Sequence, residues 1–174
     1  LVMLLTGFYV HQHWKSMALQ TEVAALKQTN ARLREEVLNR ATEAFIDVRS
    51  ADGKTKGGRL RYQLLPSHAP AAVDYFRAVC DGLTDVNLEK AGNNFNVKMD
   101  DLTIYDLPFG DVKVHIGDLT VYYNKHKDVK LGFMTEKGEY INSLHIGRLI
   151  EGANVFARLA ATNGPLVIER CELL

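Results

Sequence analysis

The chain has 174 residues, which is enough for one domain of ordinary size and an additional segment. Its 21 acidic and 21 basic residues give a formal net charge of zero, so no overall charge attracts nucleic acid or an anionic membrane surface. Cys80 and Cys171 are too few for a disulfide framework. We expect them to be two buried thiols, with one bridge between them as the alternative.

The first segment, residues 1–16, begins with the apolar run LVMLLTGFYV and continues at once into HQHWK. A membrane-spanning helix needs about 20 apolar residues, so this run alone is too short and fits the second half of a span. Trp14 and Lys15 would then lie at the membrane surface, where aromatic rings and long basic side chains are favoured. The alternatives are the apolar part of a signal peptide or a helix packed on a protein partner. We expect a membrane or interfacial helix.

Residues 17–43 show a heptad pattern, which is typical of a coiled coil. The core positions, spaced by four and three residues, are Leu19, Val23, Leu26, Asn30, Leu33 and Val37. A single Asn in such a seam selects a parallel pair, because its amide is satisfied only by a polar group opposite. We predict a parallel coiled-coil stalk with these six residues as its interface. A lone amphipathic helix lying on another surface is the alternative, since the pattern covers fewer than four heptads.

After Thr42 the chain changes to short strand-like runs. Strand patterns occur at residues 44–50, 57–65, 112–123 and 165–174. Residues 68–83 favour a helix, with Pro70 near its first turn, and residues 154–164 favour a second, shorter one. One face of the first helix holds the apolar residues Val73, Phe76, Val79 and Cys80, so we expect Phe76 to be buried.

The order of these elements resembles that of the cyclophilin family, and three stretches carry the resemblance. Residues 58–82 resemble the family's opening strand, turn and helix, with Phe76 in place of a family Phe. Residues 145–159 resemble its Val-Phe-Gly-Lys-Val segment, and residues 165–174 its closing strand. The resemblance implies a mainly β fold for residues 44–174, a closed antiparallel barrel capped by two helices. The membrane segment and the coiled coil predict a long N-terminal helix before it.

The same resemblance locates the family's catalytic positions. Cyclophilins lower the barrier of about 18–20 kcal/mol to prolyl isomerisation by holding proline in an apolar pocket beside an Arg that favours the twisted amide. In this chain Val97 aligns with that Arg, Ser143 with a family His and Gly138 with a family Trp. We therefore predict that the catalytic site is degenerate, and we expect no cofactor and no metal.

No phosphate-binding loop, zinc spacing or HExxH motif is present, and we expect His145 to be packed rather than catalytic. These observations favour a non-catalytic scaffold or accessory subunit of a membrane complex, with protein partners on the stalk and head and no nucleic acid. The alternatives are an active membrane-tethered prolyl isomerase with a rearranged site and a soluble coiled-coil adaptor. The lack of Asn-x-Ser/Thr acceptors and of a disulfide pattern favours a mitochondrial membrane over the endomembrane system.

Overall fold

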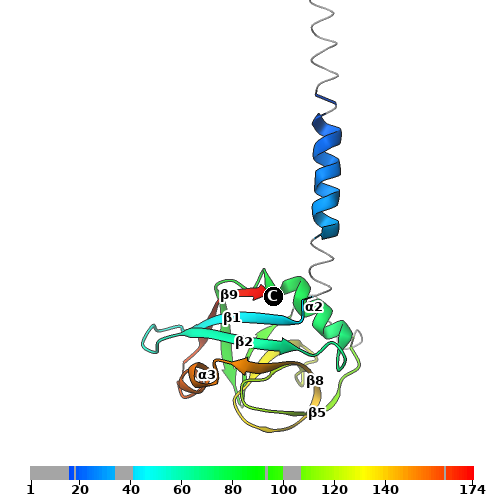
Figure 1. Cartoon of the computed structure of the whole chain (residues 1–174). Coiled ribbons are helices and arrows are strands. Elements are labelled where there is room, and N and C mark those ends of the chain that lie inside the picture. The colour runs from blue at the N-terminus through cyan, green and yellow to red at the C-terminus, as the bar shows by residue number, and fades with distance from the viewer. Residues whose placement is uncertain (1–15, 18, 34–40, 93, 100–106, 163) are drawn as a thin grey trace, which may run out of the picture. The chain divides into compact units, whose positions relative to one another are not determined.

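The computed structural model describes residues 16–17, 19–33, 41–92, 94–99, 107–162 and 164–174 (Figure 1). The chain divides into two compact units, Leu1–Arg40 and Ala41–Leu174. Most of the predicted membrane segment lies outside the described residues. Within the described ones, no helix is both long and apolar enough to cross a membrane.

In the first unit, the described residues between 16 and 33 are helical. Every described side chain of this helix is exposed, including the predicted interface residues Leu19, Val23, Leu26, Asn30 and Leu33. Val37 lies outside the described residues. The pairing of this helix with a second one therefore stays a prediction.

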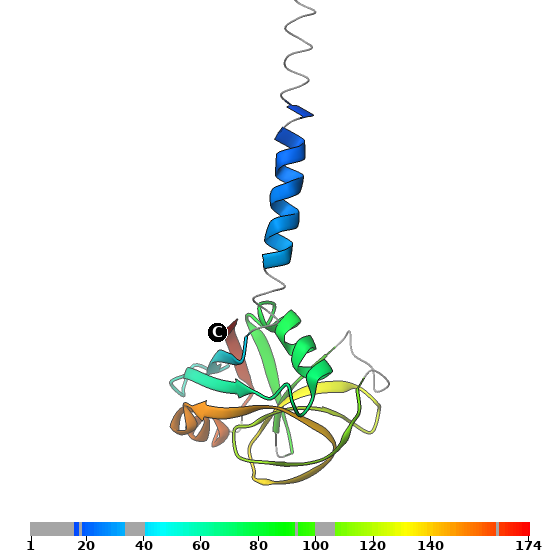
Figure 2. The ribbon, with the colours of Figure 1, turned by 45° about the vertical axis from the view of Figure 1, so that its right-hand side comes forward.

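The second unit contains nine strands and two helices in its described part. They are β1 (Glu43–Ser50), β2 (Gly58–Leu64), α2 (Pro70–Cys80), β3 (Val86–Ala91), β4 (Asn94–Lys98), β5 (Gly110–Val114), β6 (Leu119–Tyr123), β7 (Val129–Met134), β8 (Gly138–Glu151), α3 (Ala153–Ala160) and β9 (Leu166–Leu173). The strands pair antiparallel in the order β2-β1-β9-β3-β4-β7-β6-β8-β5, and β2 also pairs with β8. Figures 1 and 2 show α2 and α3 on different sides of these strands.

Strand β1 shows why these residues form a sheet with one buried face. Ile46 and Val48 point inward and are fully buried, as the alternation of a half-buried strand requires. On the outer face, Arg59 of β2 donates two hydrogen bonds to the Asp47 carboxylate, at 2.8 and 2.9 Å, and Arg170 of β9 lies 3.3 Å from it. These hydrogen bonds from arginine lower the pKa of Asp47. The outer face is thus held by a cross-strand ladder of charges.

Helix α2 packs its apolar face on the sheet, and the predicted burial of Phe76 is confirmed. Phe76 and Val73 are fully buried, and Val79 packs partly buried against them. Arg77, only 6% exposed, donates to the carbonyl oxygen of Ala41 and to Asp74. This contact ties the start of the unit to the helix, and it explains why the compact unit begins before β1.

The expectation of two free thiols is wrong, because Cys80 and Cys171 form a disulfide bond. Cys80 ends α2 and Cys171 lies on β9, and packing of the helix on that strand brings their Cα atoms to 5.3 Å. The two residues are 91 positions apart, so no local pattern could reveal the pairing. A loop of this length corresponds to roughly 4–5 kcal/mol of stabilisation through the unfolded chain.

The strand predicted over residues 112–123 is also wrong as a single element, because it breaks into β5 and β6. Between them Gly117 adopts a φ of +88°, a conformation that residues with a side chain rarely adopt. The Asp118 carboxylate accepts a hydrogen bond of 2.8 Å from the backbone N–H of His115, which stabilises the turn. As a result β5 pairs with β8, whereas β6 pairs with both β7 and β8.

Candidate functional site

The structure separates the three positions that align with the family's catalytic residues. Val97 lies half-buried on β4, opposite Leu131 of β7. Gly138 and Ser143 both lie on β8, which β7 and β6 separate from β4 in the sheet order. Ser143 is 4% exposed, and its hydroxyl donates to the carbonyl oxygen of Ile141 at 3.0 Å.

Val97 lines a groove of about 350 Å³ on the face of β3, β4 and β7. We call it the β4 groove. Its other lining residues are Asn87, Glu89, Asn96, Lys98, Asp128 and Lys130. Because β4 lies between β3 and β7 in the sheet, side chains from three neighbouring strands meet there.

A network of hydrogen bonds satisfies the polar groups at the centre of the β4 groove. Lys130 donates to the Asn96 side-chain oxygen at 3.0 Å, and the Asn96 amide donates to the Glu89 carbonyl oxygen at 3.2 Å and to Asn94 at 3.1 Å. The Tyr122 hydroxyl also donates to Asn94, at 3.2 Å. Burial raises the pKa of Tyr122 to about 12, so this phenol stays protonated and remains a donor at neutral pH.

The composition of the β4 groove limits the chemistry that it can perform. A prolyl-isomerase site requires an apolar pocket for the proline ring and a planar fork of donors beside it. Among the described residues, no arginine lines the groove, and Val97 is the only apolar one that does. The amide, ammonium and carboxylate groups suit hydrogen bonding to a polar, extended segment. Nor do the described residues contain a group of three or more His, Cys, Asp and Glu arranged to hold a metal.

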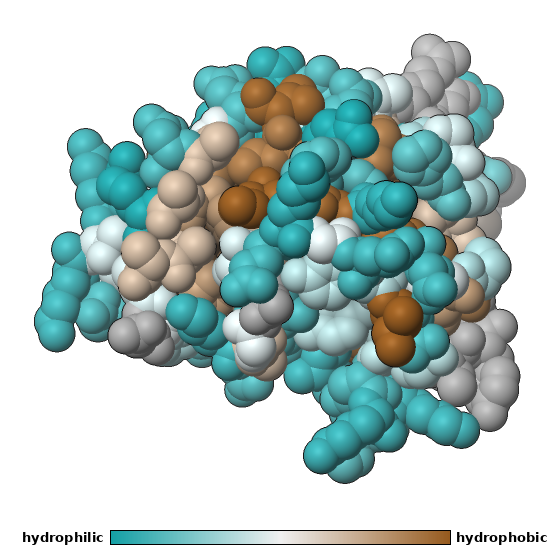
Figure 3. Space-filling model, turned by 90° about the horizontal axis from the view of Figure 1, so that it is seen from below, coloured by the Kyte–Doolittle hydropathy of each residue, from teal (hydrophilic) through white to brown (hydrophobic). Residues whose placement is uncertain are grey.

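A second hollow, of about 440 Å³, lies where the long strand β8 leaves β5 and continues beside β6 and β2. We call it the β8 hollow. Its lining residues are His68, Val112, Lys113, Leu144, His145 and Arg148. Figures 1 and 2 show how strongly β8 curves on this side of the molecule. Seen from below, the surface is mainly hydrophilic, with hydrophobic residues in small groups (Figure 3).

His145 is packed, as its sequence context predicted, but the structure adds a buried carboxylate partner. The side chain is 6% exposed, and its Nε2 lies 3.0 Å from Oδ2 of Asp118, which is 1% exposed. The approach is not that of a well-directed N–H···O bond, so we describe it as a close contact between the imidazole and the carboxylate. Burial by itself would raise the pKa of Asp118, but His145 and the backbone N–H groups of His115 and Leu149 together lower it.

The sequence pattern could not reveal that His145 and Arg148 share this hollow. Residues three positions apart point to opposite faces of a regular strand. Here the register shifts, because consecutive β6 residues Leu119 and Thr120 pair with Gly147 and His145, which leaves Ile146 as an extra residue on β8. Such a bulge re-aims the side chains that follow it. No sequence signal marked it.

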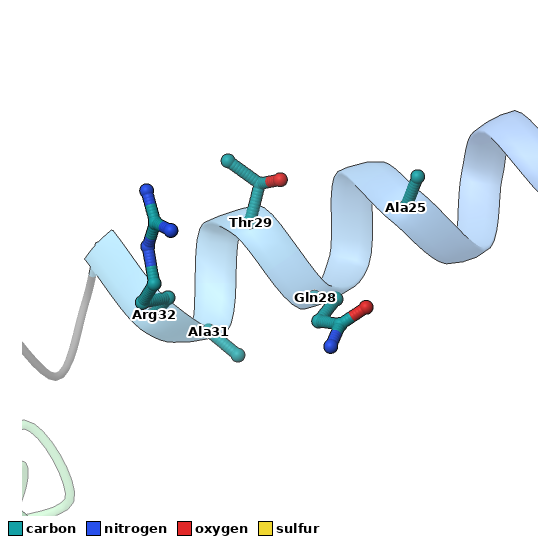
Figure 4. A pocket seen from close by; sticks show the side chains of 5 residues that line it. All are labelled: Ala25, Gln28, Thr29, Ala31 and Arg32. Atoms are coloured by element: carbon teal, nitrogen blue, oxygen red, sulfur yellow. The ribbon is translucent and has the colours of Figure 1, made fainter.

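A third hollow lies beside the helix of the first unit (Figure 4). Its five lining residues are Ala25, Gln28, Thr29, Ala31 and Arg32. All of them belong to one helix, so no second element of the described chain encloses the space. Two of the five are alanines, whose side chains are too short to form a wall. Within the described residues this surface is an open helix face rather than an enclosed pocket.

The arrangement of strands and helices in residues 41–174 defines a mainly β protein with a cyclophilin-like fold. Among solved structures, the cyclophilin of Mimivirus matches with a TM-score of 0.57 and 14% sequence identity, over 78% of this chain and 90% of that one. No protein-family model and no curated protein matches the chain. Since the identity is low, the match establishes the fold alone.

Proposed function

We propose that this protein is a non-catalytic scaffold or accessory subunit of a membrane-associated complex, with a closed-barrel, cyclophilin-like head that binds protein partners. The pairing of β2 with β8 supports closure of the barrel. The observation that carries the functional proposal is the composition of the β4 groove. It holds the position aligned with the family's catalytic Arg, and Val97 occupies that position.

The contacts within the groove support this loss of catalysis. A Lys is a poor substitute for the planar guanidinium fork, and Lys130 is already bonded to Asn96. The Lys98 ammonium lies 3.7 Å from the Asp128 carboxylate. A substrate proline would therefore meet charged and amide groups that already have partners, rather than an apolar wall and a free donor.

The coiled-coil stalk would hold the protein to a partner chain. Along the described helix, large apolar side chains at the heptad positions are about half exposed or more: Leu19 60%, Val23 48%, Leu26 58% and Leu33 48%. Pairing with a second helix in parallel would bury them and would satisfy Asn30 against a polar group opposite. Three heptads are marginal in free solution, so a membrane tether through residues 1–16 would help by raising the effective concentration.

The disulfide bears on the proposed location. Disulfides persist in oxidising compartments and are rare where thiols are kept reduced. The Cys80–Cys171 bond therefore removes one of the two observations that favoured a mitochondrial membrane over the endomembrane system. We place the head on the oxidising side of its membrane, whichever of the two membranes that is.

A proline-isomerisation assay on a short peptide tests the proposal. The Ala41–Leu174 head should give no rate above background, with an active cyclophilin assayed in parallel as the positive control. Circular dichroism of the same sample confirms that the head is folded. Turnover within about a hundredfold of the control would overturn the proposal in favour of an active, membrane-tethered isomerase.

A further inference from the structure

The β8 hollow gathers four basic side chains from three separate parts of the head. His68 comes from the loop after β2, Lys113 from β5, and His145 and Arg148 from β8. The loop is held against β8 because the backbone N–H of Leu65 donates to the carbonyl oxygen of Ile146 at 2.9 Å. The rings of His68 and His145 are consequently 6.2 Å apart between centroids.

Lys113 and Arg148 have no acidic partner among the described residues. Both are exposed, and neither makes a salt bridge or a side-chain hydrogen bond there. Glu139 lies opposite Lys113 in the β5–β8 register, yet the two side chains are not paired. In the same unit, by contrast, Arg49, Arg59, Arg61, Arg77 and Arg170 all contact carboxylates. Lys113 and Arg148 differ from these five arginines in having donors available to a ligand.

The buried side of the hollow is built to hold one imidazole in place. Asp118 accepts backbone hydrogen bonds from His115 at 2.8 Å and from Leu149 at 3.3 Å, which fixes its carboxylate. That carboxylate faces Nε2 of His145 at 3.0 Å. A carboxylate behind a histidine orients the ring. The negative charge of Asp118 is thereby directed at His145, and the hollow itself presents cations.

We propose that the β8 hollow is a binding site for a phosphate monoester. Two permanent positive charges match a dianion, and the guanidinium of Arg148 offers the paired donors that phosphate oxygens accept. A volume of about 440 Å³ leaves room for an organic group on the ester oxygen. Lys113 and Arg148 would repel a metal cation, so two neighbouring histidines do not make this a metal site. The proposal goes beyond the scaffold function and is independent of the isomerase question.

Calorimetric titration of the full chain at low salt tests the site. Phenyl phosphate should bind with a dissociation constant below about 10 mM, and acetate should bind at least about tenfold more weakly. Arg148→Gln should weaken phenyl phosphate binding about tenfold or more, since it removes charge-assisted hydrogen bonds. The affinity of Arg148→Lys for phenyl phosphate should lie between those of the parent and Arg148→Gln, because lysine keeps the charge but lacks the paired donors of the guanidinium.

Arg158→Gln is the matched control, because it removes the same charge from an exposed position on α3. It should leave binding within about twofold of the parent. His68→Gln, at an exposed position beside the buried His145, should weaken binding without affecting the fold, which circular dichroism checks.

Three results would overturn the proposal: no binding of phenyl phosphate at about 10 mM, equal binding of acetate, or equal losses in Arg148→Gln and Arg158→Gln. Two further titrations distinguish the sources of the ester. Glycerol 3-phosphate represents a free small molecule, and a short phosphoserine peptide represents a modified protein partner. Both ligands should bind if the site recognises the phosphate group. The ligand with the lower dissociation constant shows whether the ester comes from a small molecule or from a modified protein.

Discussion

The β4 groove and the β8 hollow lie on the same head and both contain lysine, yet the polar side chains in them are satisfied in different ways. In the groove, Lys130 and Asn96 bond to each other and to neighbouring backbone. In the hollow, Lys113 and Arg148 have no such partners within the described chain. A polar group whose bonds are complete stabilises the fold, whereas one with unused donors is available to a ligand. The comparison separates a structural network from a candidate site.

The largest effect is expected at the carboxylate beneath the hollow. Asp118→Asn removes a buried carboxylate that accepts the backbone N–H groups of His115 and Leu149, and it leaves one of these donors facing an amide N–H. The expected cost is about 3 kcal/mol in the free energy of unfolding. Urea unfolding of the head measures this. Asp128→Asn is the control in the groove, because its ion pair with Lys98 is partly exposed and is worth less than about 1 kcal/mol. Equal losses of stability in Asp118→Asn and Asp128→Asn would contradict the idea that the carboxylate beneath the hollow matters more to the fold than the one in the groove.

A smaller effect is expected within the groove network. Asn96→Ala should lower the free energy of unfolding by about 1–3 kcal/mol, because Asn96 is 2% exposed and its removal leaves the Glu89 carbonyl oxygen and Lys130 without that partner. Asn87→Ala, at an exposed position in the same groove, should change it by less than about 0.5 kcal/mol. If Asn96→Ala is as mild as Asn87→Ala in thermal or urea unfolding, the network is not structural.

The smallest effect concerns acid pH. Asp118 has a lowered pKa in the folded protein, so its ionised form stabilises the fold above the unfolded value of about 3.9. That contribution is lost as the pH falls through the lowered folded pKa. The parent should therefore lose more stability than Asp118→Asn between about pH 5 and the acid limit. Parallel pH profiles in the two proteins would show that this carboxylate contributes nothing through its charge.

Local sequence patterns predicted the outer elements of the head with small errors at their ends. The run at residues 44–50 corresponds to β1, that at 57–65 to β2 and that at 165–174 to β9. Residues 68–83 contain α2, and residues 154–164 overlap α3. These elements carry their own periodicity and turn residues, so short-range preferences suffice to find them. The error at residues 112–123 arose because Gly117, within a β-like run, forms the turn that separates β5 from β6.

The candidate sites were less predictable than the elements. The resemblance drew attention to Val97, which does line the groove, but it grouped Val97 with Ser143 and Gly138, which lie on another strand. The hollow was missed, and His145 was interpreted only as a packed residue. Its neighbours in the hollow, Asp118 and Arg148, suggest a role beyond packing. Strand pairing and a bulge in β8 bring these residues close to His145.

By itself, the sequence located the first two strands, the two helices and the last strand of the head, showed which face of the first helix is apolar, and indicated that residues 44–174 resemble a cyclophilin. Periodicity, propensity and turn chemistry act over a few residues, and all of them can be read along the chain. Only the tertiary structure decided the Cys80–Cys171 bond, the complete network of the β4 groove and the unpaired cations of the β8 hollow. Each of these depends on strand register and helix docking, which join residues that are far apart in the chain.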